Sequence, residues 1–462
     1  MRIIKLKVPF LAKYMKFSTT SSYSQSVALT AVINLGLSGI GIISGLLVAR
    51  LLGPTGRGEF AAIQTWPNMI AVLSAFGLHD ALAYYVSREP NRVGSWLGTA
   101  TISALLIGIP FATVGYWLMP WLLQAQSAVV IAAAQIYLLW YIPVNILLGF
   151  PSYPLRARND LSTWNLLRLL PSLVWLSVLF YSTITQNVNP VSLSWHYLLA
   201  STTLVMPIWY IANRRLPHAI AVDRRQIRPL FVYGLPSVLS FIPANLNLRL
   251  DQMLIAGMLG PRILGLYVVA VAWSNALSPL LGALSATLLP RMASATSDLQ
   301  SAQLFAQVTR IGLLISLAVS FFTALSAPFA IPLLFGSEYK DSIIVAMVLA
   351  SGTGIALFNQ LLVAGALSLG EPKLALLAEG IGLAVTVLLL LILLQPYQLM
   401  GAAIASICSY TTVSCVLLVL LKRKTKLSLA EFVCPQMVDI QTIIARLGTI
   451  AGLRSQPDSL PF

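Results

Sequence analysis

The sequence contains few charged residues for its length. Only 9% of its 462 residues are Asp, Glu, Lys or Arg, whereas 58% are hydrophobic and the mean hydropathy is +0.83. A soluble protein carries about 25% charged residues, so this composition excludes a soluble protein. Apolar stretches of about twenty residues, long enough to cross a bilayer, recur along the whole chain. The composition therefore indicates a polytopic membrane protein.

Several other features are scarce or absent. The three cysteines, Cys408, Cys415 and Cys434, have neither disulfide-framework nor metal-ligand spacing. No GxxxxGK[ST] sequence is present, which argues against direct ATP hydrolysis. The basic N-terminal stretch lacks the long apolar core and cleavage site of a signal peptide. We therefore expect a protein without a cofactor, whose residues 1–25 form an uncleaved cytosolic tail.

Twelve apolar stretches are the expected transmembrane helices. The sequence contains no succession of short alternating strands, which argues against a membrane barrel. They cover approximately residues 28–49, 59–77, 95–119, 128–150, 163–183, 192–212, 231–250, 264–289, 309–333, 343–367, 374–394 and 399–421. The expected fold class is an all-α bundle of two six-helix lobes. Its expected parts are a tail at 1–25, lobes at 26–213 and 231–421, a basic linker at 214–230, and a cytosolic tail at 422–462.

The positive charges favour one orientation. With the N terminus in the cytosol, the opposite side of the membrane holds only Arg50, Arg57, Arg262 and Lys340. Cytosolic loops are enriched in Lys and Arg, so both termini are expected in the cytosol of a cytoplasmic-membrane protein. The net charge of +15 then reflects topology and affinity for anionic lipid headgroups, and nucleic acid is not an expected partner.

An internal repeat relates the two halves. The stretch LVARLLGPTGRGEFAAIQTWPN from Leu47 returns as LIAGMLGPRILGLYVVAVAWSN from Leu254, without a gap. The matched pairs include Gly53 with Gly260, Pro54 with Pro261, Gly58 with Gly265, Trp66 with Trp273 and Asn68 with Asn275. Composition does not explain Gly-Pro, Trp and Asn residues in register. Duplicated halves in a membrane protein are typical of a transporter whose substrate site lies between them.

Five stretches carry a family resemblance: RLLGPTGRGEF, NLRLDQMLIAGMLGPRILGLYVVA, LLFGSEYKDS, LSLGEPK and PYQLMGAAIASICSY. In this order they resemble the oligosaccharide and polysaccharide flippases of the multidrug, oligosaccharidyl-lipid and polysaccharide exporter superfamily. The resemblance implies a transporter, not an enzyme, that flips a polyprenyl-diphosphate-linked oligosaccharide to the outer leaflet by alternating access. It also implies polysaccharide polymerase and transferase partners.

Polar residues inside the expected helices are candidates for a substrate cavity, because burying them in lipid is costly. In the seventh span, Asn245 lies four residues before Arg249, and Asn247 four before Asp251, which predicts two polar stripes on one helix. Arg168 enters the fifth span, where it meets a diphosphate or snorkels to the surface. The alternative for Arg249 and Asp251 is a simple anchor at the outer surface. Arg310 is interpreted as an interfacial anchor.

Asp80 and Glu379 are candidates for proton or cation coupling, and their alternative is a carboxylate satisfied by water or arginine near the interface. The glycines of the first span are expected to allow close helix approach. They are Gly36, Gly39, Gly41 and Gly45.

Two other functions compete with flipping. A cation-coupled multidrug exporter needs a carboxylate deep in the bundle, whereas here arginines enter the spans. A membrane glycosyltransferase or polymerase needs a large extracytosolic loop with acidic residues, and every loop on that side is short.

Overall fold

The computed structural model describes residues 23–185, 188–217, 219–278, 298–425, 427–437 and 439. Every regular element in these ranges is a helix. The first half contains α2 (Tyr23–Ser74), α3 (Leu78–Arg88), η1 (Pro90–Arg92), α4 (Val93–Leu122), α5 (Ala128–Gly149), α6 (Ser152–Ala157), α7 (Leu161–Thr185), α8 (Pro190–Thr203) and α9 (Val205–Arg215). Next come η2 (Arg224–Gln226) and α10 (Ile227–Asn247). The second half contains α11 (Leu250–Met258), α12 (Pro261–Ser274), α14 (Asp298–Leu334), η3 (Ser337–Ser342), α15 (Ile343–Ser368), α16 (Pro372–Thr425) and α17 (Leu429–Val433).

Eight helices are long and apolar enough to cross a membrane, counted over the described residues. Two of them, Leu29–Arg88 and Pro372–Thr425, each contain two of the twelve predicted spans. The predicted span 192–212 is divided at Leu204 into the shorter helices α8 and α9. The predicted span 264–289 reaches beyond the described residues. The all-helical membrane architecture is therefore confirmed, and the count of twelve stays a prediction.

Helix α2 changes direction at Gly53 instead of ending in a loop. Gly53 has φ 63° and ψ −179°, a backbone conformation that glycine adopts without a steric penalty. Pro54 follows directly, and helical structure resumes after it. Helix α16 is interrupted in the same way at Gln398, two residues after Pro396. Two of the predicted boundaries between spans, 49–59 and 394–399, thus lie at interruptions within long helices.

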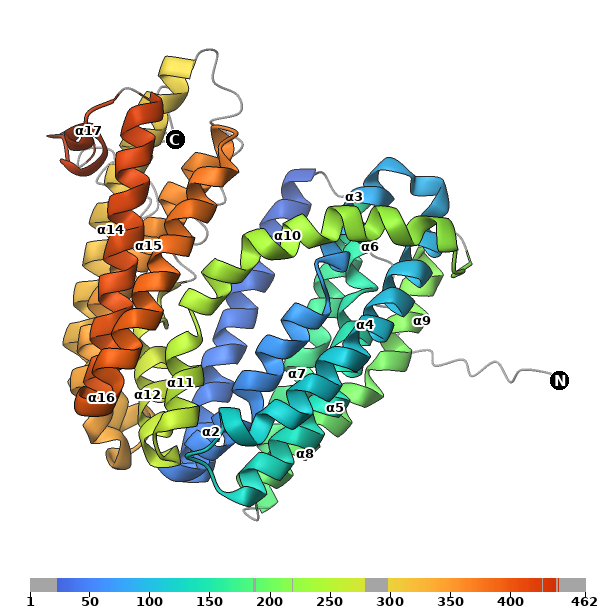
Figure 1. Cartoon of the computed structure of the whole chain (residues 1–462), viewed down its shortest axis with the longest axis horizontal. Helices are drawn as coiled ribbons and strands as arrows, with labels where there is room; N and C mark the ends of the chain where they lie inside the picture. The colour runs from blue at the N-terminus through green and yellow to red at the C-terminus, as the bar shows by residue number, and fades with distance from the viewer. Residues whose placement is uncertain are drawn as a thin grey trace.

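Helix α10 joins the two halves. In Figure 1 it lies across the upper part of the molecule, beginning beside the first-half helices and ending beside α16. Its start is attached to the first half, because Tyr84 of α3 stacks on Tyr233 with ring centroids 4.3 Å apart. The basic linker is attached there too, since the Ala221 N–H donates to the Gly94 carbonyl of α4.

The internal repeat is broken at the end of α10. Residues of α10 and α11 correspond by the repeat offset to the first, uninterrupted part of α2. The second-half copy instead ends at Asn247 and restarts at Leu250, with Arg249 at φ −135° between them. Helix α10 continues through Pro236 and Pro243.

The halves contact each other closely at the end that carries the Gly53 kink, which we call the kink end. Arg50 of α2 reaches the last carbonyls of α14, with Nε 2.6 Å from the Leu334 oxygen. The Tyr339 hydroxyl donates to the Ala49 carbonyl at 2.9 Å, and the Gln126 amide donates to the Ala256 carbonyl at 2.8 Å. Donors from both halves therefore satisfy carbonyls of the opposite half.

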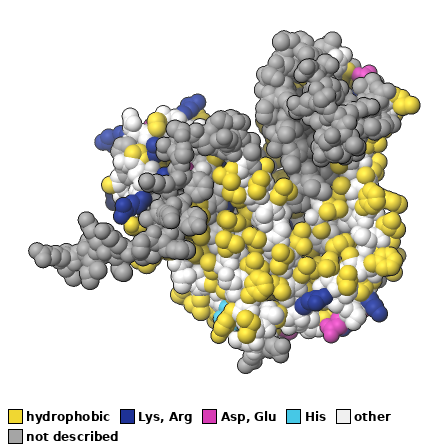
Figure 2. Space-filling view, turned by 180° about the vertical axis from the view of Figure 1, so that it is seen from behind, with side chains coloured by type: hydrophobic (Ala, Val, Ile, Leu, Met, Phe, Trp, Pro, Cys, Tyr) yellow, Lys and Arg dark blue, Asp and Glu magenta, His cyan; other side chains and the backbone are white. Residues whose placement is uncertain are grey.

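The outer surface suits a bilayer. Figure 2 shows hydrophobic side chains over the middle of one face, with Lys and Arg toward its ends. Large apolar side chains are exposed, among them Trp117 at 76% and Met206 at 82%. An apolar surface of this extent is stable only in contact with lipid or protein. The chain is therefore a multi-pass membrane protein.

The C-terminal segment packs onto α14. Phe432 of α17 is fully buried and makes an edge contact with Phe305. Arg310, which was expected to be an interfacial anchor, is instead 6% exposed and bonds through Nε to Asp439 at 2.6 Å. The prediction for Arg310 was wrong because its acidic partner lies more than a hundred residues away in sequence.

Candidate functional site

Arg249 lies at the break between α10 and α11. Its side chain is exposed, and among the described residues it forms no hydrogen bond or ion pair. The guanidinium is close enough to the Tyr141 hydroxyl of α5 to interact with it electrostatically. Arg249 of the second half therefore contributes a positive charge that acts on Tyr141 of the first half.

Tyr141 belongs to a polar stripe on α5. The Asn145 amide donates to the Tyr141 hydroxyl at 2.9 Å, and the Tyr137 ring stacks on the Tyr141 ring at 5.2 Å. These three residues recur every four positions and so share one face of the helix. Sequence reasoning missed them, although this spacing was a usable signal.

Arg168 lines a cavity next to the same tyrosine. The cavity has a volume of about 240 Å³ and is formed by α5, the start of α6, α7 and α8. Its polar lining residues are Tyr141, Asn145, Ser152, Arg168, Tyr197 and Ser201. Arg168 donates through Nη2 to Asn34 at 3.0 Å, while its Nη1 is buried without a hydrogen-bond partner among the described residues. Arg168 thus shares this cavity with Tyr141, whereas Arg249 is not among the lining residues and acts on Tyr141 only electrostatically.

The other predicted cavity residues of this region point elsewhere. Asp251 is 4% exposed and accepts from the Tyr267 hydroxyl at 2.6 Å and from Ser406 at 3.4 Å. Asn247 is also buried, and Asn245 donates to the Phe241 carbonyl on its own helix. The two predicted stripes do not lie on one helix, because α10 ends at Asn247 and α11 begins at Leu250, with Arg249 at φ −135° between them.

Asn247 instead meets one of the predicted coupling residues. Its amide donates to Glu379 Oε2 at 2.9 Å and to the Glu379 carbonyl at 3.1 Å. Its own oxygen accepts from the Thr386 hydroxyl at 3.1 Å. Helices α10 and α16 are therefore joined by a polar cluster that contains a half-buried carboxylate.

Asp80, the other coupling candidate, lies at the start of α3. Its carboxylate accepts from the Ser237 hydroxyl of α10 at 2.5 Å and lies 3.6 Å from His79 Nε2. The side chain is 47% exposed. Asp80 and Glu379 thus both hydrogen-bond to α10, Asp80 at its middle and Glu379 at its last residue.

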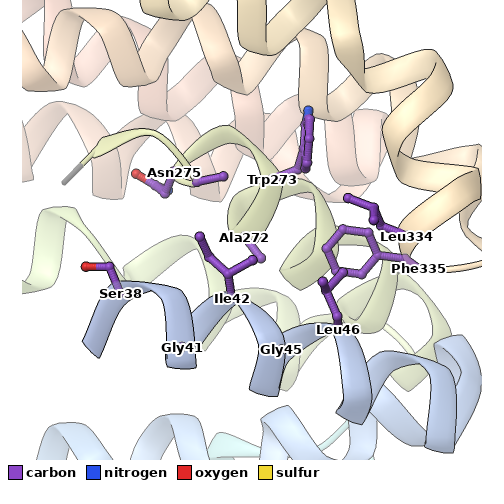
Figure 3. A pocket seen from close by; sticks show the side chains of 11 residues that line it. Ser38, Gly41, Ile42, Gly45, Leu46, Ala272, Trp273, Asn275, Leu334 and Phe335 are labelled. Carbon is purple, nitrogen blue, oxygen red and sulfur yellow. The ribbon is translucent and has the colours of Figure 1, made fainter. Parts of the chain in front are cut away.

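A second cavity of about 300 Å³ separates the halves near α2 (Figure 3). Ile42 and Leu46 of α2 face Ala272 and Trp273 of α12, with Phe335 closing one side. The lining is apolar apart from Ser38 and Asn275, so it offers no charge to a substrate headgroup. The first-span glycines were expected to allow close helix approach, and in the described part of the chain no helix approaches them closely, because a Cβ added at any of the four would meet no atom within 4 Å.

Comparison with known proteins shows which family has this arrangement. Residues 47–344, more than half of the chain, match a family described as polysaccharide biosynthesis protein. The chain belongs to this family. An uncharacterised membrane protein of Methanocaldococcus jannaschii is 22% identical over 385 residues, which cover 76% of this chain and 75% of that protein.

Two solved structures show the same fold. An inward-facing multidrug resistance MATE family transporter of the MOP superfamily superimposes with a TM-score of 0.70 at 16% identity, covering 86% of this chain and 98% of that one. The lipid II flippase MurJ in an inward closed conformation superimposes with a TM-score of 0.68 at 12% identity, covering 93% and 94%. The family and the fold confirm the resemblance predicted from the sequence motifs.

Proposed function

We propose that this polysaccharide biosynthesis protein flips a polyprenyl-diphosphate-linked oligosaccharide from the inner to the outer leaflet of the cytoplasmic membrane. The observation that carries the proposal is that Arg168 lines the Tyr141 cavity while Arg249, from the opposite half, acts electrostatically on Tyr141. Neither arginine has a carboxylate partner among the described residues. Unpaired cations in a membrane protein are costly and mark the path of an anionic substrate.

The chemistry of the cavity suits this substrate. Arginine binds phosphate through two parallel hydrogen bonds, which fixes the position of a diphosphate. The hydroxyl and amide groups of Tyr141, Asn145 and Ser201 offer hydrogen bonds to sugars. The polyprenyl chain stays in the bilayer, because the outer surface of the protein is apolar and borders the hydrocarbon.

Alternating access follows from where the halves meet. The orientation favoured by the positive charges puts the kink end outside the cell, where Arg50, Tyr339 and Gln126 join the halves. The substrate then reaches the cavity from the cytosolic leaflet and leaves when these contacts separate. Asp80 and Glu379, both bonded to α10, are positioned to couple an ion or a proton to that movement.

The test is clearance of the lipid-linked intermediate. Cells lacking this protein are expected to accumulate lipid-linked oligosaccharide on the inner leaflet, and wild type clears it. Arg249→Ala is expected to fail, Arg249→Lys to clear partly, and Arg262→Ala to clear fully, because Arg262 lies at the kink end in an exposed ion pair with Asp341. Absence of the intermediate in deleted cells overturns the flippase proposal, and drug efflux is then the activity to assay. Full clearance by Arg249→Ala at equal expression removes Arg249 from the site.

A further inference from the structure

Two arginines share the ring of Trp164, and one of them, Arg168, lines the Tyr141 cavity. The guanidinium carbon of Arg168 lies 4.4 Å from the centroid of Trp164, and that of Arg156 lies 5.5 Å from it. Arg156 is on the last turn of α6 and is exposed, whereas Arg168 is on α7 and partly buried. The pair therefore runs from the surface into the cavity.

The charge of this pair is not balanced by the described residues. Neither arginine forms an ion pair there, and the two guanidinium groups are close enough to repel each other. Asp160 lies between them in sequence, but its Oδ1 accepts from the Thr163 N–H and so caps α7. Bringing like charges together destabilises the protein unless an anion compensates them.

Stacking on the Trp164 ring leaves the N–H groups at the edge of each guanidinium able to form hydrogen bonds. A guanidinium that lies over an aromatic ring uses its face, while its five N–H groups point outward in the plane. For Arg168, Nη2 is occupied by Asn34, and Nη1 is buried with no partner in the described part of the chain. An unsatisfied buried donor of a charged group costs several kcal/mol or is satisfied by a ligand.

We propose that Arg156, Trp164 and Arg168 form a docking site for a prenyl diphosphate, with Arg156 at its surface end and Arg168 at its cavity end. The inference rests on the proposed function, and it adds Arg156 and Trp164 to the substrate path. Trp164 holds both cations at fixed positions, so that the two phosphates meet preorganised donors. A monoanionic or neutral headgroup uses only part of this site.

The experiment measures binding of farnesyl diphosphate to the purified full chain in detergent, with farnesol as the uncharged probe. Arg156→Gln is expected to weaken farnesyl diphosphate binding about tenfold, as loss of a charge-assisted hydrogen bond does. Trp164→Leu is expected to weaken it as well, although both charges remain. Arg158→Gln is the matched control, because Arg158 is an exposed arginine two residues away that contacts no ring among the described residues.

Equal effects of Arg156→Gln and Arg158→Gln would show a general surface charge and overturn the site. Unchanged binding in Arg156→Gln, with monodisperse protein, also overturns it. A second assay, which measures flipping of lipid-linked oligosaccharide in proteoliposomes, distinguishes failure of this site from failure of the proposed function. Arg156-dependent diphosphate binding without flipping supports the site and refutes the flippase, whereas flipping with Arg156-independent binding refutes the site alone.

Discussion

Gly58 and Gly265, which occupy matching positions of the repeat, face each other where α2 crosses α12. A Cβ added at Gly58 would lie 1.7 Å from the Pro261 carbonyl oxygen, and one added at Gly265 would lie 1.8 Å from the Pro54 carbonyl oxygen. Pro54 and Pro261 also match each other in the repeat. The contact is therefore reciprocal, as expected at an axis that relates two parallel repeats.

Adding one methyl group at this crossing is expected to lower the stability of the protein strongly. Gly58→Ala is expected to destabilise the protein by about 1–3 kcal/mol or more, because the new Cβ meets backbone that cannot rotate away. Gly265→Ala is expected to act equally, since its surroundings mirror those of Gly58. Thermal unfolding in detergent measures both. Gly260→Ala is the control, since nothing described lies within 4 Å of its added Cβ, and equal melting of all three variants would contradict the prediction.

The repeat predicted two related halves but not this contact. A constant offset in sequence shows which residues are equivalent, and it does not show where the axis between them runs. Motifs rich in Gly and Pro were read as family markers, whereas the structure shows that Gly58 and Gly265 are needed for backbone contact. Conversely, Gly41 and Gly45 looked like packing glycines and line an open cavity. A glycine in the sequence does not show whether its position packs against another backbone or lines a cavity.

Arg50 is expected to hold the two halves together at the kink end. Its guanidinium is bonded to the Leu333 and Leu334 carbonyls, which terminate α14 and have no partner within that helix. Arg50→Ala is expected to loosen the junction between the halves, so that a cysteine at Ser38, beside the cavity of Figure 3, reacts faster with a membrane-impermeant maleimide added outside. The native cysteines are first replaced by serine.

Arg262→Ala provides the comparison for Arg50. Arg262 lies 3.4 Å from Asp341 in an exposed ion pair within the second half, which contributes about 0–1 kcal/mol. Its removal takes one positive charge from the same end without touching the junction. Unaltered maleimide labelling in Arg50→Ala, or the same acceleration in Arg262→Ala, would show that Arg50 does not hold the halves together.

The buried pair of Arg310 and Asp439 predicts a role for the C-terminal segment. Asp439 is fully buried, and Arg310 also bonds to the Glu431 carbonyl. Asp439→Leu or Arg310→Met alone is expected to cost about 3–5 kcal/mol, because each change leaves a buried group uncompensated. The double variant Arg310→Met with Asp439→Leu is expected to recover much of that loss. Melting temperatures of the three proteins decide, and additive losses in the double variant would contradict the pairing.

The candidate site was partly predictable. Charged residues within apolar spans stand out, so Arg168 and Arg249 were found from sequence. Tyr141 and Asn145 were missed because charge within a span was the signal used, and both residues are uncharged. Asn247 and Asp251 were assigned to the cavity on helical spacing, and that spacing fails where the backbone breaks at Arg249. A break of this kind depends on tertiary contacts of α10 with both halves, which no local pattern contains.

Glu379 predicts how transport responds to an ion gradient. Glu379→Gln removes the charge and keeps an oxygen to accept from the Asn247 amide, so the contact between α10 and α16 is expected to survive. If the carboxylate couples an ion or a proton to the movement of α10, the variant flips substrate in proteoliposomes at the same rate with and without an imposed proton or sodium gradient. Glu371→Gln serves as control, because Glu371 pairs with Lys424 at the surface. A gradient response in Glu379→Gln equal to that of wild type would exclude Glu379 from coupling and leave Asp80, which bonds to the other part of α10, as the next residue to change.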